Sequence, residues 1–264
     1  MRFFSRTSSK ARKVQQKVSC MENKKLKDYV TVITGASSGM GDAIARRFAE
    51  EGSRVVLSAR RAERLETLAG ELKGKGHEAF AVPADVTDFS QVQNLVKEAV
   101  DAFGRIDVMV NAAGFGYLKP FEENTVEEID LQIDVNVKGV CYGSKAVLDV
   151  MKKQGAGNII NIGSIASVRH FADFAVYSGA KHAVLGFSKS LYEEVRKFGI
   201  RINVLCPAAV NTEFLDVAGY KDPPWKPEEM IQAEDIAELA LTCVTLPKNI
   251  QLESMVIWPL AQET

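Results

Sequence analysis

Short runs of β-branched and apolar residues alternate with longer amphipathic segments along most of this chain, and this alternation limits the folds open to it. From Tyr29 onward, the runs expected to be buried strands are "YVTVIT", "SRVVLSA", "EAFAVPAD", "DVMVNAAG", "NIINIGS", "RINVLCP" and "SMVIWP". Helical patterns lie between them at 41–51, 62–72, 88–103, 126–153 and 177–198. Because parallel strands need long crossover connections, this order predicts an α/β fold: a doubly wound parallel sheet with helices on both faces.

Composition narrows the class of protein further. A chain of 264 residues, 46% of them hydrophobic, can bury one large core, so we predict a single domain. The net charge of −1 gives no electrostatic reason to bind nucleic acid or an anionic membrane. No apolar run approaches the roughly 20 residues of a membrane span, so we expect a soluble protein.

The first segment, "MRFFSRTSSKARKVQQKVSC", is basic and has no acidic residue before Glu22. Its composition is that of an organellar transit segment or of a disordered tail, and translation from Met21 is a third reading. We favour a dispensable tail at 1–24, followed by one folded domain at 25–264.

The cysteines and histidines are scattered along the chain. They are Cys20, Cys141, Cys206, Cys243, His77, His170 and His182. Without a C-x-x-C spacing, they predict neither a zinc site nor a redox pair, and no metal site is expected. A reduced, cytoplasmic setting fits them best.

A glycine-rich turn, "TGASSGMG", follows the first strand and precedes a helix. Glycine there permits a tight turn and lets a pyrophosphate approach backbone N–H groups at the positive end of the helix. The spacing differs from the usual Gly-x-Gly-x-x-Gly fingerprint, and a bland glycine loop is the alternative, but the strand-to-helix junction favours a nucleotide site. The residues assigned to the cofactor here are Gly35, Ser37, Ser38, Gly39, Met40 and Gly41.

The second strand ends in "VVLSARR", where a NAD-dependent protein commonly carries an acid that holds the ribose hydroxyls. Ala59 occupies that place and is followed by Arg60 and Arg61. A guanidinium grips a 2′-phosphate in forked geometry, so we predict NADP(H) over NAD(H). The alternative is that both arginines only solvate the start of the next helix.

The third and fourth strands end in "PADV" and "NAAG". Asp85 and Val86 are expected beside the adenine, although turn chemistry alone also explains such residues. The small residues expected to line the cofactor floor are Asn111, Ala112, Ala113 and Gly114.

Tyr177 and Lys181, in "YSGAK", lie four positions apart and would stack one helical turn apart. A chance Tyr-x-x-x-Lys occurs in roughly half of all chains of this length, so the pair alone proves nothing. The other motifs of the chain decide whether this pair is catalytic.

Taken together, the motifs resemble those of the short-chain dehydrogenase/reductase family over about residues 27 to 260. They are, in order, "TGASSGMG", "NAAG", "NVKG", "IGSIAS", "YSGAK" and "CPAAVNTE". The resemblance implies a seven-stranded Rossmann-type sheet, a nicotinamide cofactor, and a homotetramer or homodimer. It also implies a catalytic tetrad of Asn136, Ser164, Tyr177 and Lys181.

In this reading Tyr177 donates the proton to a carbonyl oxygen, and Ser164 holds that oxygen by a hydrogen bond. The Lys181 ammonium and a positive nicotinamide are expected to make the phenol easier to ionise. Asn136, unfavourable inside a helix, would hold a water that links Lys181 to solvent. A strand-end serine and a solvated asparagine are the ordinary alternatives.

After the sixth strand, the resemblance assigns Pro207, Val210 and Thr212 to the cofactor, with Ala208 where the family often has glycine. Residues 214–230 are expected to form a lid over the substrate. The alternative for Trp225 is that it covers the core.

The C-terminal "LESMVIWPLAQET" resembles the branch of NADP-dependent 3-hydroxy acid, serine and short-chain alcohol dehydrogenases. The predicted activity is reversible hydride transfer between NADP(H) and a small aldehyde, ketone or 3-hydroxy acid. A 3-oxoacyl-[acyl-carrier-protein] reductase is the second hypothesis, and a non-catalytic NADP-binding regulatory protein is a remote third. The residues expected to set the substrate lie in the lid and in 166–174, where Arg169 or His170 would hold an acid group if either faces the cleft.

Overall fold

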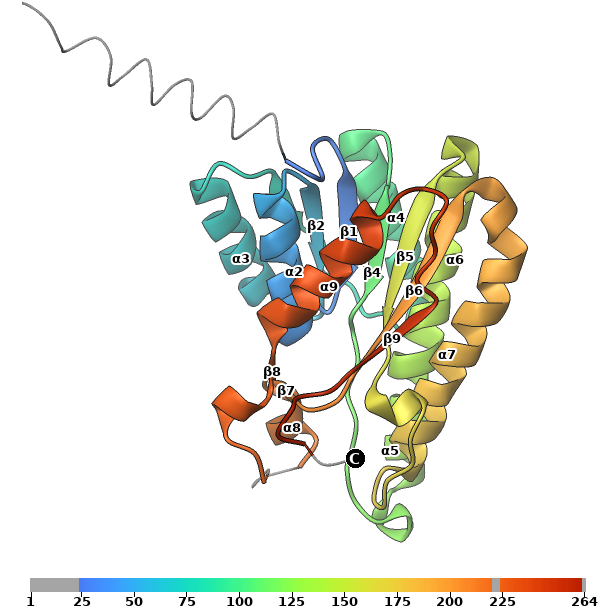
Figure 1. Cartoon of the computed structure of the whole chain (residues 1–264). Helices are drawn as coiled ribbons and strands as arrows, with labels where there is room; N and C mark the ends of the chain where they lie inside the picture. The colour runs from blue at the N-terminus through green and yellow to red at the C-terminus, as the bar shows by residue number, and fades with distance from the viewer. Residues whose placement is uncertain (1–23, 220–223, 263–264) are drawn as a thin grey trace, which may run out of the picture.

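One parallel sheet forms the centre of the computed structural model, which describes residues 24–219 and 224–262 (Figure 1). Its strand order is β3-β2-β1-β4-β5-β6-β9, and every neighbouring pair is parallel. The strands are β1 (Val30–Thr34), β2 (Arg54–Ser58), β3 (Ala79–Ala81), β4 (Val108–Asn111), β5 (Gly157–Ile162), β6 (Ile200–Pro207) and β9 (Ser254–Ile257). The predicted doubly wound α/β fold is confirmed, whereas the predicted basic tail and the start at Met21 fall outside the described residues.

Helices cover both faces of the sheet (Figure 1). One face carries α2 (Gly39–Glu50), α3 (Ala62–Gly74) and α9 (Ala233–Thr245), and the other carries α4 (Phe89–Phe103), α6 (Gly139–Gln154) and α7 (Ala175–Val195). The alternation of side chains in β1 divides the core: Ile33 packs in the α2 layer, while Val30 and Val32 pack in the α4 layer. Helix α9 has no counterpart among the helices predicted from sequence.

The predicted helix at 126–153 is interrupted by a wider turn. Helix α5 (Val126–Ile133) runs into a π-helical turn, η2 (Asp134–Lys138), and then into α6. The backbone remains helical at both junctions, so the segment is one helix with extra residues in one turn. Such turns interrupt otherwise regular helices and are frequent at functional sites.

The remaining short elements mostly lie near the carboxyl ends of the strands. They are η1 (Phe121–Glu123), η3 (Ile165–Ser167), η4 (Arg196–Phe198), α8 (Phe214–Val217), η5 (Pro227–Glu229), and the two-stranded parallel sheet of β7 (Val210–Asn211) and β8 (Ile231–Gln232). Of the helices in the described part of the chain, none is long and apolar enough to cross a membrane.

Candidate active site

The turn between β1 and α2 depends on its glycines. Gly35 and Gly39 have φ of 70° and 55°, in the left-handed region where a side chain costs energy. A Cβ on Gly35 would lie 2.6 Å from the backbone nitrogen of Ala113, and one on Gly41 would overlap the carbonyl oxygen of Gly35. The glycines thus let the turn pack directly against the loop that follows β4.

Two adjoining cavities open at this edge of the sheet. The smaller, of about 300 Å³, lies at the glycine turn, and the larger, of about 500 Å³, lies at the ends of β5 and β6. Both are lined by Met40, Ala112, Gly114, Thr212 and Phe214. A ligand that spans both cavities would therefore pass over the glycine turn and the end of β4.

The predicted cofactor residues divide between the two cavities. The smaller is lined by Gly35, Ser37, Ser38, Gly39, Met40, Gly41, Arg60, Arg61, Asp85, Val86, Ala112, Gly114 and Thr212, and Pro207 and Val210 line the larger. Asn111 lines neither, because its buried amide nitrogen donates to Asn161 at 2.8 Å and to Ser144 at 3.3 Å. Ala208, which replaces the family's frequent glycine, lines the larger cavity.

The four residues of the predicted tetrad are all buried. Asn136 lies in η2, Ser164 follows β5, and Tyr177 and Lys181 lie one turn apart in α7. Ser164, Tyr177 and Lys181 line the larger cavity, and Asn136 lies behind Gly114. The structure therefore gathers all four at the junction of the two cavities.

Tyr177 is held between aromatic rings. Its ring centroid lies 6.2 Å from that of Phe174 and 5.5 Å from that of Phe214. Burial raises the pKa of Tyr177 to about 12, and the neighbouring Ser164 hydroxyl opposes this shift only in part. In the protein by itself, removal from water therefore favours the neutral phenol, and the expected ease of ionisation beside a bound nicotinamide stays a prediction.

Lys181 is buried beside this ring. Its Nζ atom donates to the carbonyl oxygen of Ile162 at 2.9 Å and lies 5.6 Å from the centroid of the Tyr177 ring. Burial lowers the pKa of Lys181 to about 8. The lysine is thus fixed to the end of β5 and exchanges its proton more readily than an exposed lysine does.

Asn136 has one buried atom without a partner. Its amide nitrogen donates to the carbonyl oxygens of Phe115 at 2.7 Å and Gln132 at 2.8 Å, whereas Oδ1 accepts no hydrogen bond from any residue that the structure describes. A Cβ on Gly114 would lie 3.0 Å from Oδ1 and 3.3 Å from Lys181 Nζ. Both atoms therefore face the same small space beside Gly114, which suits a polar atom that bonds to both.

Ser164 begins the short helix η3. Its hydroxyl oxygen accepts the N–H of Ala166 at 3.1 Å. A serine hydroxyl still has a proton to donate when its oxygen accepts. Ser164 can therefore both end the strand, as the ordinary alternative holds, and donate a hydrogen bond into the larger cavity.

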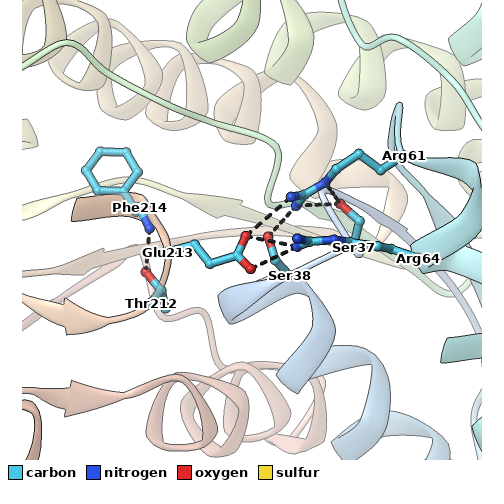
Figure 2. Close-up of polar contacts among 7 residues, drawn as sticks. All are labelled: Ser37, Ser38, Arg61, Arg64, Thr212, Glu213 and Phe214. Atoms are coloured by element: carbon cyan, nitrogen blue, oxygen red, sulfur yellow. Dashed lines mark hydrogen bonds and ion pairs between the residues drawn. The ribbon is translucent and has the colours of Figure 1, made fainter. Parts of the chain in front are cut away.

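Arg61 and Glu213 line the smaller cavity, and Arg64 joins them through its contacts with Glu213 (Figure 2). Arg61 donates to the hydroxyl of Ser37 at 2.9 and 3.1 Å and to that of Ser38 at 2.7 Å. Both arginines also bind Glu213, which sequence analysis did not single out. The spacing of Arg61 and Arg64, three residues apart at the start of a helix, was a usable signal for Arg64.

The predicted lid contributes part of the wall of the larger cavity, although 220–223 fall outside the described residues. Phe214, Leu215, Pro224 and Trp225 line it, so Trp225 faces the cavity. Leu118 and Gln262 also line it and were not predicted. The Gln262 side chain is held there because its Oε1 atom accepts a hydrogen bond from the N–H of Ala209 at 3.2 Å. No local sequence motif predicts this contact.

Within the stretch 166–174, the cavity is lined by Phe171, Ala172, Asp173 and Phe174. Arg169 and His170 are exposed and are not among the lining residues, and the His170 ring stacks on His182 with centroids 5.3 Å apart. In the described ranges, no three His, Cys, Asp or Glu side chains are grouped to hold a metal ion.

Comparison with known proteins places this geometry in a family. Residues 29–221 match the family model described as short chain dehydrogenase. An uncharacterized oxidoreductase of Staphylococcus saprophyticus is 38% identical over 244 residues, which cover 90% of this chain and 98% of that protein.

Two solved structures extend the likeness. An alcohol dehydrogenase from the archaeon Thermococcus sibiricus, complexed with 5-hydroxy-NADP, has 36% identity and a TM-score of 0.82, over 89% of this chain and 98% of that one. A closed form of serine dehydrogenase complexed with NADP+ has 31% identity and a TM-score of 0.82, over 89% of this chain and 96% of that one. The chain therefore belongs to the short-chain dehydrogenase family, and it is an enzyme of the oxidoreductase class.

Proposed function

We propose that this protein is an NADP(H)-dependent oxidoreductase that interconverts a small neutral carbonyl compound and the corresponding alcohol. The observation that carries the proposal is the position of Tyr177, Ser164 and Lys181, which line a 500 Å³ cavity adjoining the glycine turn. When bound, a nicotinamide cofactor supplies or accepts the hydride. The remaining chemistry falls to the residues of this chain.

The described residues fit a dinucleotide. The glycine turn leaves no room for a Cβ and directs the start of α2 toward the smaller cavity, which suits a pyrophosphate. Asp85 and Val86 would contact the adenine, while Pro207, Val210 and Thr212 would contact the nicotinamide end. These assignments agree with the NADP-type ligands of the two solved relatives.

NADP(H) is favoured over NAD(H) by the end of β2. Ala59 lines the smaller cavity where a ribose-binding acid would repel a phosphate, and Arg60 and Arg61 line it beside Ala59. Arg61 is already oriented by Ser37 and Ser38. A prearranged guanidinium loses less entropy when it binds a 2′-phosphate.

Proton transfer is assigned to Tyr177. Burial keeps the phenol protonated in the protein by itself, so Tyr177 carries the proton that carbonyl reduction consumes. A bound, positively charged nicotinamide would lower the pKa of this phenol for the reverse reaction. Ser164 would donate a second hydrogen bond to the same carbonyl oxygen and hold it in place. Asn136 Oδ1 and Lys181 Nζ face one small space, where a shared water would replace the proton that Tyr177 gives up.

The substrate class follows from the wall of the larger cavity. Its aromatic lining includes Phe171, Phe174 and Trp225, and the charged members of its described lining are Asp173 and the buried Lys181. Lys181 is bonded to Ile162, and Asp173 would repel a carboxylate. A neutral ketone, aldehyde or secondary alcohol fits this wall better than a 3-hydroxy acid.

Other readings are separated by one assay. NADPH oxidation and NADP+ reduction would be followed by absorbance with simple ketones and secondary alcohols, 3-hydroxy acids and 3-oxoacyl thioesters, and repeated with NAD(H). We expect the highest kcat/KM with neutral carbonyl compounds and NADPH. Preference for a thioester would support the carrier-protein reductase, and NADPH binding with no turnover would support the regulatory reading.

The proposed assembly rests on the family resemblance, and the proposed location rests on the scattered cysteines. We propose a homotetramer or homodimer of the catalytic domain at 25–264, located in the cytoplasm. Light scattering during size-exclusion chromatography, on the full chain and on a chain that starts at Met21, tests both the assembly and the dispensability of the tail.

A further inference from the structure

Glu213 places a carboxylate at the rim of the smaller cavity, between two guanidinium groups (Figure 2). Arg64 Nη1 donates to its Oε1 at 2.9 Å and to its Oε2 at 3.0 Å, and Arg61 Nη1 donates to Oε2 at 3.3 Å. The same Arg61 holds Ser37 and Ser38 of the glycine turn. One anion therefore already fills a site with two cations and two hydroxyls around it.

The site is built for an anion rather than for this particular side chain. Arg61 and Arg64 come from the start of α3, whereas Glu213 comes from the segment between β7 and α8, 149 residues from Arg64. The Arg64 hydrogen bond and then Arg61 hold the pKa of the Glu213 carboxyl below its usual range, so it is charged at neutral pH. These side chains are about half exposed, so the ion pairs are weak and exchangeable.

The neighbours of Glu213 connect this rim to the centre of the site. The Thr212 side chain contacts Gly39 of the turn, since a Cβ on Gly39 would lie 3.2 Å from Thr212 Cγ2. On the other side, the Phe214 ring packs against the Tyr177 ring with centroids 5.5 Å apart. A change in what Glu213 binds would therefore act directly on its neighbours Thr212 and Phe214, which line both cavities.

We propose that Glu213 is a built-in competitor of the cofactor's 2′-phosphate, occupying the Arg61 and Arg64 guanidiniums until NADP(H) displaces it. The inference rests on the proposed NADP(H) function, and it adds Arg64 to the two guanidiniums, of Arg60 and Arg61, already assigned to the phosphate. A phosphate monoester carries more negative charge than a carboxylate and offers three acceptor oxygens, so it wins the exchange. Glu213 therefore lowers the affinity for NADP(H). When the phosphate displaces the Glu213 carboxylate from the arginines, the segment Thr212–Phe214 is released as well.

The test uses Glu213→Gln, which keeps the shape and removes the charge, and two probes without a nicotinamide: adenosine 2′,5′-bisphosphate and AMP. Calorimetric titration of the full chain should show that the variant binds the bisphosphate about three- to tenfold more tightly than the unmodified protein does. AMP affinity should change less than about twofold, because AMP has no 2′-phosphate. Asp216→Asn, the same charge change in the same segment on an exposed residue, should bind both probes as the unmodified protein does.

Arg64→Met supplies the second arm. It should weaken bisphosphate binding in both the Glu213 and the Glu213→Gln backgrounds, because the phosphate takes over this guanidinium. Weaker bisphosphate binding by Glu213→Gln would mean that the carboxylate positions the arginines for the phosphate, and it would overturn the competition. Weaker AMP binding alone would assign Glu213 to the ribose hydroxyls and overturn it equally.

Failure of the proposed function looks different. If the unmodified protein binds AMP as tightly as the bisphosphate, the preference for NADP(H) itself is wrong. If it prefers the bisphosphate and Glu213→Gln gains nothing over Asp216→Asn, the NADP(H) assignment stands and only the role of Glu213 is lost.

Discussion

The ammonium group of Lys181 lies 5.6 Å from the centroid of the Tyr177 ring and donates a hydrogen bond to the carbonyl oxygen of Ile162 at 2.9 Å. Both side chains are buried, and burial moves their pKa values apart, up to about 12 for the tyrosine and down to about 8 for the lysine. The neutral phenol is the stable form. The phenol therefore carries the proton that a developing alkoxide would take, and the Lys181 ammonium beside it would stabilise the phenolate left behind.

Replacing Tyr177 by Phe removes that proton and little else, because the ring still packs between Phe174 and Phe214. We expect kcat for carbonyl reduction to fall by about 10² to 10⁴-fold, the usual contribution of general acid catalysis. The Kd for NADPH, measured by fluorescence, should change less than about threefold. Tyr192→Phe removes a hydroxyl from the same helix, outside both cavities, and should keep full activity; comparable activity of the two variants would refute the role of Tyr177.

The stability of the fold should depend on pH through Lys181. Its pKa is about 8 in the folded protein against 10.5 ordinarily, so the folded state binds fewer protons between these values and its stability rises with pH in that window. Relative to Lys181→Met, the free energy of unfolding should gain about 2 to 3 kcal/mol from pH 7 to pH 10. Urea denaturation at both pH values measures this difference. An unchanged difference would mean that the lysine is not desolvated in the fold.

Glycine at position 35 should be required by packing as well as by backbone conformation. Gly35→Ala combines a φ of 70° with a Cβ 2.6 Å from the nitrogen of Ala113. Gly104→Ala is the matched control, because its φ is 74° and nothing lies within 4 Å of the added Cβ. We expect the free energy of unfolding to fall by about 1 kcal/mol in Gly104→Ala and by at least 3 kcal/mol in Gly35→Ala. Only Gly35→Ala should lose NADPH binding. Thermal unfolding with and without NADPH distinguishes them, and equal losses would contradict the packing argument.

Cofactor preference should depend more on Arg61 than on Arg60. Arg60 and Arg61 both line the smaller cavity. Arg61 is also hydrogen-bonded to Ser37 and Ser38, so its guanidinium is already oriented before the cofactor binds. Arg61→Ala should raise the Kd for NADPH by about 10 to 100-fold, the loss expected for a charge-assisted pair, and Arg60→Ala by less than about tenfold. NADH binding serves as the internal control and should be nearly unchanged in both. A larger effect from Arg60 would reverse the assignment.

The strands and the doubly wound parallel sheet were predictable because β-branched runs and amphipathic segments are local signals, and parallel crossovers then leave few topologies. The glycine turn and the pair at 177 and 181 were visible for the same reason. The extra residues in η2 were not, since hydrophobic periodicity does not reveal one wider turn in a long helix.

Contacts between distant segments outside the recognised motifs escaped prediction. Nothing in the sequence near Glu213 indicates a bond to Arg64, and nothing near Gln262 places it beside Ala209. The raised pKa of Tyr177 in the protein by itself could not be predicted from the motif, because its burial is a property of the packed molecule.

The wide turn at Asp134–Lys138 cannot be replaced by a regular α-helical turn without cost to the site. Deleting one residue there would let the chain wind regularly from Val126 to Gln154 and would satisfy helix-propensity rules better. Each residue of an α-helix rotates the chain by about 100°, so the deletion would swivel one half of the helix against the other. Either Asn136 would then turn away from Gly114, or the buried face of α6 would turn away from the sheet. The wide turn allows both to be correctly oriented at once.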